Sequence, residues 1–202
     1  MKHTIASLLI SAALMACSAA NADTIAAYTD GTNASNGSVS SGDFTYCYGQ
    51  SFTTYADGTD DYLTGIYLLA GTDHHGSGTL YLFTSAYTGT AGSIASATTN
   101  LLGTATWNSS SNVWDFSSSS IVLTAGTKYY FYYVPTEASS FWYGSSYSGG
   151  EYYLSMSSSS TFNSMALDMN FVVTGTAVPE PATVAGFAGL AALGFAAMKR
   201  RK

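Results

Sequence analysis

Residues 129–134 read Tyr129-Tyr130-Phe131-Tyr132-Tyr133-Val134, and this run decides the fold class. Aromatic and β-branched residues of this kind are typical of β-strands, in which successive side chains point to opposite faces. The run is therefore aromatic on both faces, although a strand at the centre of a β-sandwich needs only one face in the core. Either an added loop covers the second face, or that face is an exposed platform of rings.

The rest of residues 23–177 repeats the strand signal in short segments separated by clusters of Gly, Ser, Asn and Asp, which form turns. The clearest alternation lies in residues 167–173, where the apolar residues are expected to face the core and Asp168 and Asn170 the solvent. About ten short strands in such a domain predict an all-β, jelly-roll-like β-sandwich. The expected strands are 24–28, 44–53, 63–70, 79–84, 103–108, 113–116, 121–123, 127–134, 141–144, 152–156 and 167–173.

An export signal occupies residues 1–22, which read MKHTIASLLISAALMACSAANA. Lys2 supplies a positive start, and the apolar run that follows is too short to span a bilayer stably. Ala20-Asn21-Ala22 is a small-x-small cleavage site, so we expect a secretory signal peptide cut before Asp23.

The two cysteines depend on how this signal is processed. Leu14-Met15-Ala16-Cys17 is a loose lipobox, so lipidation at Cys17 is the alternative to ordinary cleavage. Ordinary cleavage leaves Cys47 as the sole thiol, which excludes an intramolecular disulfide. Cys47 lies in a strand-like run and is interpreted as a small buried hydrophobe.

Residues 178–202 carry the most specific signal in the chain. They begin with Val178-Pro179-Glu180-Pro181, which cannot continue a helix because proline lacks the N–H. Residues 182–198 contain no charge and are long enough, as one transmembrane helix, to cross a thin hydrocarbon core. The chain closes with Lys199-Arg200-Arg201-Lys202, which the positive-inside rule keeps in the cytoplasm. The domain before the tail is then outside.

This tail resembles the PEP-CTERM sorting signal, which has also been described as an ice-binding-protein C-terminal domain. In that family a membrane protease, exosortase, recognises the Pro-Glu-Pro tail and removes it. The resemblance implies that exosortase is a partner, and that Glu180 is a recognition residue without a catalytic role. It also implies a Gram-negative host that secretes exopolysaccharide, and sorting across the inner membrane to the envelope or extracellular matrix. The Thr-x-Thr rows of an ice-binding face are not visible.

The central part resembles the choice-of-anchor β-sandwich domains of bacterial surface proteins, of the R type. The shared segments are Gly-Gln-Ser-Phe-Thr at 49–53, Tyr-Leu-Thr-Gly-Ile at 62–66, Leu-Tyr-Leu-Phe at 80–83 and Leu-Thr-Ala-Gly-Thr-Lys-Tyr-Tyr at 123–130. Such domains occur with interchangeable surface anchors and have no established enzymatic activity. The resemblance therefore implies a surface module that is not an enzyme.

Charge and aromatic content limit the partners of the domain. Between residues 23 and 178 a single cation, Lys128, stands against eleven acids, and such a domain repels the phosphates of nucleic acid. Exposed Tyr and Trp rings stack well on the apolar faces of sugars. Tyr130, Tyr132, Trp142 and Tyr143 are therefore candidate glycan contacts, and the alternative is that these rings pack in the core.

Three carboxylates lie close together at Asp57, Asp60 and Asp61. Ca²⁺ prefers several oxygen ligands on a flexible loop, so these residues are a candidate calcium site, with Asp168 as a further ligand. The alternative is an ordinary Asp-Gly turn, and the EF-hand pattern is not met. No other cofactor is expected.

Catalytic motifs are missing from the sequence. His74-His75 is interpreted as a solvated loop, because adjacent side chains on an extended segment point in opposite directions. Glu137 and Glu151 form a glycosidase pair only if the fold brings them together.

The sequence thus predicts a signal peptide (1–22), a β-sandwich (23–177) and a sorting tail (178–202). The expected function is a non-catalytic structural or adhesive role linked to exopolysaccharide, as in a biofilm matrix. The alternative is a carbohydrate-binding module that uses exposed Tyr and Trp.

Overall fold

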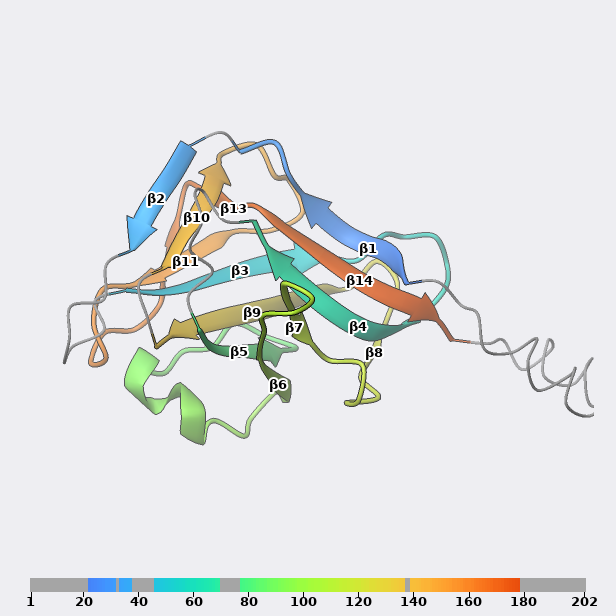
Figure 1. Ribbon diagram of the computed structural model, residues 1–202, viewed down its shortest axis with the longest axis horizontal. Coiled ribbons are helices and arrows are strands. Elements are labelled where there is room, and N and C mark those ends of the chain that lie inside the picture. Colours follow the sequence, from blue (N-terminus) through green and yellow to red (C-terminus); the bar gives the residue numbers. More distant parts are fainter. Residues whose placement is uncertain (1–21, 32, 38–45, 70–76, 137–138, 179–202) are drawn as a thin grey trace, which may run out of the picture. The chain divides into compact units, whose positions relative to one another are not determined.

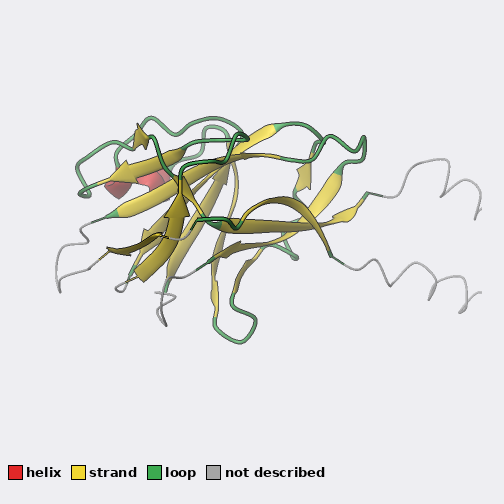
Figure 2. Cartoon of the chain, turned by 90° about the horizontal axis from the view of Figure 1, so that it is seen from above, coloured by secondary structure: helices red, strands yellow, loops and turns green. Residues whose placement is uncertain are grey.

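A computed structural model describes residues 22–31, 33–37, 46–69, 77–136 and 139–178 (Figure 1). Within this part of the chain Ala22–Thr176 forms one compact unit. Strands dominate it, and the short helical segment is the 3-10 helix η1 (Ala91–Ser96), drawn in red in Figure 2. The strands are β1 (Asp23–Tyr28), β2 (Asn33–Gly37), β3 (Cys47–Thr53), β4 (Asp61–Leu68), β5 (Gly78–Phe83), β6 (Leu101–Asn108), β7 (Val113–Asp115), β8 (Val122–Leu123), β9 (Lys128–Pro135), β10 (Ser139–Gly144), β11 (Tyr152–Ser155), β12 (Asn163–Met165), β13 (Asp168–Met169) and β14 (Phe171–Ala177).

Most of these strands belong to one antiparallel sheet, in the order β1-β14-β4-β7-β6-β5-β9-β3-β11-β12, with β8 beside β4. A second, small sheet has the order β13-β10-β2 and packs against the large one through Phe141 of β10. The large sheet curls into a half-barrel: the ring of Phe171 on β14 lies 6.0 Å from that of Phe52 on β3 and 5.7 Å from that of Phe131 on β9. The all-β prediction is confirmed. The structure shows one large curled sheet, and Phe141 of β10 and Met169 of β13 in the small sheet pack into the same core. The jelly-roll-like arrangement stays a prediction.

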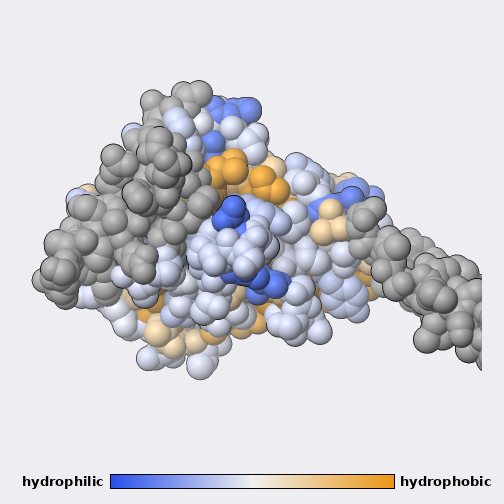
Figure 3. Space-filling model, viewed as in Figure 1, coloured by the Kyte–Doolittle hydropathy of each residue, from blue (hydrophilic) through white to orange (hydrophobic). Residues whose placement is uncertain are grey.

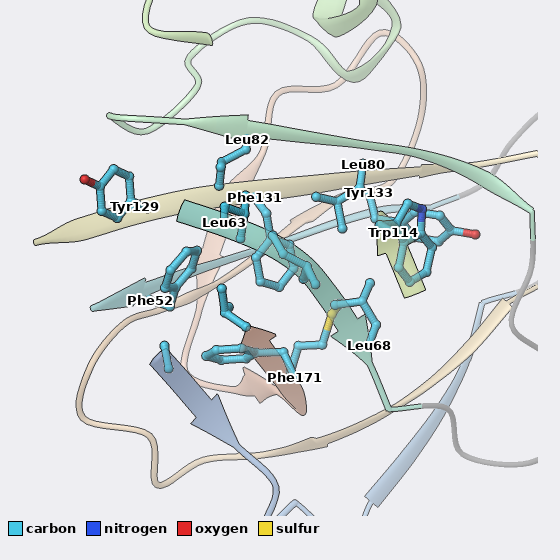
Figure 4. Close-up of a cluster of buried hydrophobic side chains, with 14 of the residues drawn as sticks. Phe52, Leu63, Leu68, Leu80, Leu82, Trp114, Tyr129, Phe131, Tyr133 and Phe171 are labelled. Atoms are coloured by element: carbon cyan, nitrogen blue, oxygen red, sulfur yellow. The ribbon is translucent and has the colours of Figure 1, made fainter. Parts of the chain in front are cut away.

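The main core fills the inside of the curl, where aromatic and aliphatic side chains from distant strands meet (Figure 4). The side chains of Phe131 and Tyr133 on β9 point into it, together with Trp114 from β7, and all three are fully buried. The rings of Trp114 and Tyr133 meet edge to face with centroids 5.1 Å apart. Burial of such large apolar surfaces is the main stabilising contribution in a chain with so few charges.

The second face of β9 is also covered, as the first of the two alternatives for this strand predicts. Tyr132 is fully buried in a second cluster, formed where residues 84–100 with η1 and the segment before β12 cross the outer side of the sheet. Its ring packs 4.6 Å from that of Phe162, and its hydroxyl accepts the backbone N–H of Tyr87 at 3.0 Å. Gly49 leaves room for this ring, since a Cβ there would lie 2.5 Å from Tyr132 Cδ1. The covering-loop alternative is therefore the correct one.

The alternation in residues 167–173 does not correspond to one strand with a solvent face. The run is divided between β13 and β14, and Asp168 and Asn170 are buried. At Asn170 the chain passes from the small sheet to the large one. The Asn170 amide donates to Gly31 O at 2.9 Å and accepts from Gly31 N at 3.1 Å. Asn170 therefore stabilises the point where the chain crosses between the sheets and does not face water.

Two strands lie outside the expected set. β2, with the sequence Asn-Ala-Ser-Asn-Gly, has the composition of a turn but pairs with β10 along five residues. β12 pairs with β11 at the end of the large sheet. Both lack the apolar alternation that identifies a strand from sequence, and in the structure they are defined by backbone pairing with a neighbouring strand.

Replacement of Tyr132 tests whether the outer cluster contributes to stability. We expect Tyr132→Phe to lower the free energy of unfolding by about 1 kcal/mol, because the Tyr87 N–H loses its acceptor. Tyr132→Ala should cost about 3–5 kcal/mol, because it leaves a cavity. Urea unfolding followed by tryptophan fluorescence measures both. Tyr130→Phe, on the same face but only half-buried, is the control and should stay within about 0.5 kcal/mol; equal losses in both Phe variants would contradict this account.

Candidate functional site

The two ends of the folded domain meet at one place. β1 and β14 pair antiparallel with Asp23 opposite Gly175, so the expected cleavage point after Ala22 lies beside the end of the last strand. β14 ends at Ala177, and Val178 follows it half-buried. We call this end of the sheet the terminal pole. The cleavage-site residue Ala20 and the tail from Pro179 through Glu180, Pro181 and the Lys199-Arg200-Arg201-Lys202 cluster lie outside the described residues.

Exposed apolar side chains gather at the terminal pole. Tyr62 and Val122 are ladder partners in β4 and β8, and 39% and 41% of their surfaces are exposed. A Cβ at Gly175 would lie 3.0 Å from Tyr62 O, so the pair borders the end of β14. Tyr55, 50% exposed, donates its backbone N–H to Ile25 O in β1. Rings with apolar bodies and polar tips suit a boundary between water and a lipid surface.

The acidic loop at the same pole adopts the turn that was the alternative to a calcium site. Asp57 Oδ1 accepts the backbone N–H of Thr59 at 3.0 Å, and Gly58 between them has a φ of 88°. Asp60 Oδ1 accepts the N–H of Ala125 at 3.2 Å. In the part of the chain that the structure describes, no three acidic, His or Cys side chains are placed so that they could hold a metal ion. Calcium binding by Asp57, Asp60 and Asp61 stays a prediction without a ligand set.

Asp61 differs from its neighbours because its side chain is only 8% exposed. Burial raises the pKa of its carboxyl group above the ordinary value, and the negative charges of Asp57, Asp23 and Asp60 raise it further. The charged form of Asp61 is therefore disfavoured in the folded domain.

The four candidate glycan-contact residues do not form one surface. Tyr132 is buried, and Tyr130 on the same face packs against Tyr153 with ring centroids 6.1 Å apart. Trp142 and Tyr143 are half-buried neighbours on β10, so their side chains point to opposite faces of the small sheet. The four rings therefore do not lie on one continuous exposed face, and separate glycan contacts at Tyr130, Trp142 and Tyr143 stay a prediction.

Buried polar side chains join the two sheets. Gln50 in β3 donates to Asp168 Oδ1 at 3.2 Å, and its own Oε1 accepts the N–H of Met169 at 2.9 Å. Asp168 Oδ2 also accepts the backbone N–H of Tyr147 at 3.1 Å. Burial raises the pKa of Asp168, and the hydrogen bonds from Gln50 and Tyr147 partly oppose that rise. Asp168 is thus committed to a structural contact and does not extend the acidic loop.

The other candidate reactive side chains are Cys47, the pair Glu137 and Glu151, and the pair His74-His75. Cys47 is a free, fully buried thiol whose pKa burial raises to about 12, which confirms its interpretation as a small hydrophobe. Glu151 is exposed and accepts the hydroxyl of Tyr153 at 3.2 Å. Its hypothetical partner Glu137, and the pair His74-His75, lie outside the described residues.

A pocket of about 450 Å³ lies on the outer side of the sheet, at a place that no sequence motif predicted. It is formed by the excursion between β5 and β6, residues 84–100, together with Phe83. The signal that could have located it is the length of the gap between two expected strands, since long connections in compact domains usually have a function.

The face shown in Figure 3 is mostly pale, as expected for a surface of Ser, Thr, Gly and Tyr.

Comparison with known families identifies the tail. The family model of the PEP-CTERM protein-sorting motif matches residues 177–202, the segment that follows the last strand. This motif marks an exported protein that exosortase processes and that is sorted to the cell surface. No curated protein matches the chain. Among the described residues no helix is long and apolar enough to cross a membrane, and the expected span at 182–198 is not among them.

The raised pKa of Asp61 gives a pH-dependent stability. Its stabilising contribution is complete below the ordinary carboxyl pKa of about 4 and is lost as the pH rises through the folded-state value. We expect Asp61→Asn to raise the melting temperature at pH 7, by roughly 2–4 °C for each 1 kcal/mol of relief, and to leave it unchanged near pH 3.5.

Asp115→Asn is the matched control for this measurement. Hydrogen bonds from Ser117 lower the pKa of Asp115, so its neutralisation should not stabilise the domain at pH 7. Thermal unfolding of both variants across this pH range decides the matter. A lower melting temperature of Asp61→Asn at pH 7 would mean that the Asp61 carboxylate is a net stabilising group.

Proposed function

We propose that this chain is a non-catalytic structural or adhesive protein of the cell envelope or extracellular matrix, associated with exopolysaccharide. Signal-peptide cleavage before Asp23 starts the mature chain at β1, and the C-terminal segment holds the domain at the membrane until exosortase removes it. The observation that carries the proposal is the position of the sorting motif directly after β14.

The connection between the folded domain and the sorting motif is short. Pro179 comes two residues after the end of β14, and an extended chain advances only about 3.5 Å per residue. The sequence that exosortase recognises therefore follows the last strand of the domain directly, and Tyr55, Tyr62 and Val122 are exposed at the end of the sheet that carries the last residues of β14.

The hydrogen bonds of the polar side chains agree with a structural, non-catalytic role. The buried carboxylate Asp168 and the buried amide Gln50 bind each other and backbone groups, and Asp57 and Asp60 close turns. The resemblance of the central segments to choice-of-anchor domains supports the same assignment, a surface module delivered by an anchor. A second candidate function, a carbohydrate-binding module, is favoured by the uncharged pocket at residues 83–100.

Glu180→Ala tests the sorting part of the proposal. In a host that carries exosortase, the wild-type protein should lose its tail and reach the surface, whereas the variant should keep its tail and stay with the membrane. Intact mass and immunoblots of the membrane and surface fractions report both outcomes. Glu151→Ala makes the same chemical change at an exposed site in the domain and should be processed like the wild type. Equal processing of Glu180→Ala would refute the assignment.

A further inference from the structure

The connection between β5 and β6 is much longer than pairing of these strands requires. The two strands are antiparallel neighbours that pair as far as Phe83 and Leu101, a geometry that a short hairpin could close. Residues 84–100 instead leave the sheet, form η1 and return. The need to cover Tyr132 explains why this connection places Ala91 and Ile94 in the second cluster, where both are buried. It does not explain the pocket that the ends of the excursion enclose beside it.

The lining of this pocket combines aromatic, hydroxyl and amide groups and contains no charged side chain. Phe83 is fully buried and forms the base, and the half-buried Tyr87 stands beside it with ring centroids 5.4 Å apart. The other lining residues are Ser85, Ala86, Thr88, Gly89, Ser96, Ala97, Thr98, Thr99 and Asn100. The volume of about 450 Å³ falls within the roughly 300–1,000 Å³ of typical small-ligand sites.

Hydrogen bonds hold the pocket walls in place. Tyr87 is fixed at both ends, because its backbone N–H donates to Tyr132 at 3.0 Å and its hydroxyl lies 2.8 Å from Ser93 Oγ. Asn100 has a φ of 60°, and its amide donates to Ser85 Oγ at 2.7 Å. The backbone N–H of Thr84 donates to Asn100 O at 2.9 Å and closes the neck of the excursion. A pre-formed site loses less entropy when a ligand binds.

We propose that this pocket binds a neutral saccharide, which rests on the proposed delivery of the protein to a polysaccharide-rich exterior. A sugar ring offers an apolar face to Tyr87 and a set of hydroxyls to the Ser, Thr and Asn groups around it. An anionic ligand would find no cation in the lining and would enter the field of an acidic domain. A purely apolar ligand would displace water from the exposed hydroxyl groups of Thr88, Ser96, Thr98 and Thr99 without replacing its hydrogen bonds.

The test is an NMR titration of isotope-labelled protein, purified from the cell envelope, with cellotetraose, maltotetraose and chitotetraose and with an acidic oligogalacturonate. At least one neutral tetrasaccharide should shift the amide signals of Tyr87, Thr98 and Asn100, and the acidic one should not. Asn100→Gly keeps the backbone conformation with positive φ while it removes the amide, and should weaken binding about tenfold. Thr99→Ala, at an exposed lining position, should weaken it about threefold or more without affecting the fold.

Thr104→Ala, at an exposed position of β6 outside the lining, and Trp142→Ala are the controls and should bind like the wild type. The inference is overturned if no neutral tetrasaccharide shifts these amides, if the acidic one binds equally well, or if Asn100→Gly and Thr99→Ala bind like the wild type. Failure of this titration leaves the processing of Glu180 variants unaffected. Failure of the processing experiment, in turn, leaves the titration unchanged, so the two results are distinguishable.

Discussion

Strand β9 imposes the constraint on which the rest of the domain depends, because it carries large rings on both faces. Phe131 and Tyr133 on one face require a core, and Tyr132 on the other requires a cover. The large sheet satisfies the first need when it curls and brings Phe171 of β14 against Phe52 and Phe131. Residues 84–100 satisfy the second, so the excursion from β5 to β6 is a consequence of the sequence of β9. The pocket beside it exists because this cover is longer than the rings require.

With one thiol among the described residues, and that thiol buried, and with few charges, the domain relies on hydrogen bonds of buried polar side chains to fix the relation between its two sheets. Gln50 joins β3 to β13 through Asp168 and Met169, and Asn170 binds both backbone groups of Gly31. Such bonds are directional, whereas apolar contacts tolerate sliding. The raised pKa of Asp168 shows that its burial is costly, and an unpartnered carboxylate at this position would cost considerably more.

The sequence predicted the strands wherever side chains decide the structure and missed features that backbone pairing or tertiary crossing decides. Alternation located most strands within a few residues. β2 could not be recognised, because Asn33–Gly37 has no apolar face and owes its conformation to β10. Asp168 and Asn170 follow a period of two yet are buried, because periodicity does not reveal a change of sheet. The same distinction applies to the functional features. The sorting tail was recognisable from local sequence, whereas the pocket forms only because the fold brings Phe83 and Asn100 together.

The order of the strands also bears on when the domain becomes complete. β1 is the first strand of the described residues and pairs with β14, the last, so this end of the sheet can close only when both ends of the domain are present. Pairing between such distant segments forms late, because the loop-closure entropy must be overcome first. In the proposed pathway β14 emerges immediately before the tail enters the membrane. The β1–β14 pairing is then the last step in forming the large sheet, and it closes beside the exposed side chains of Tyr55, Tyr62 and Val122.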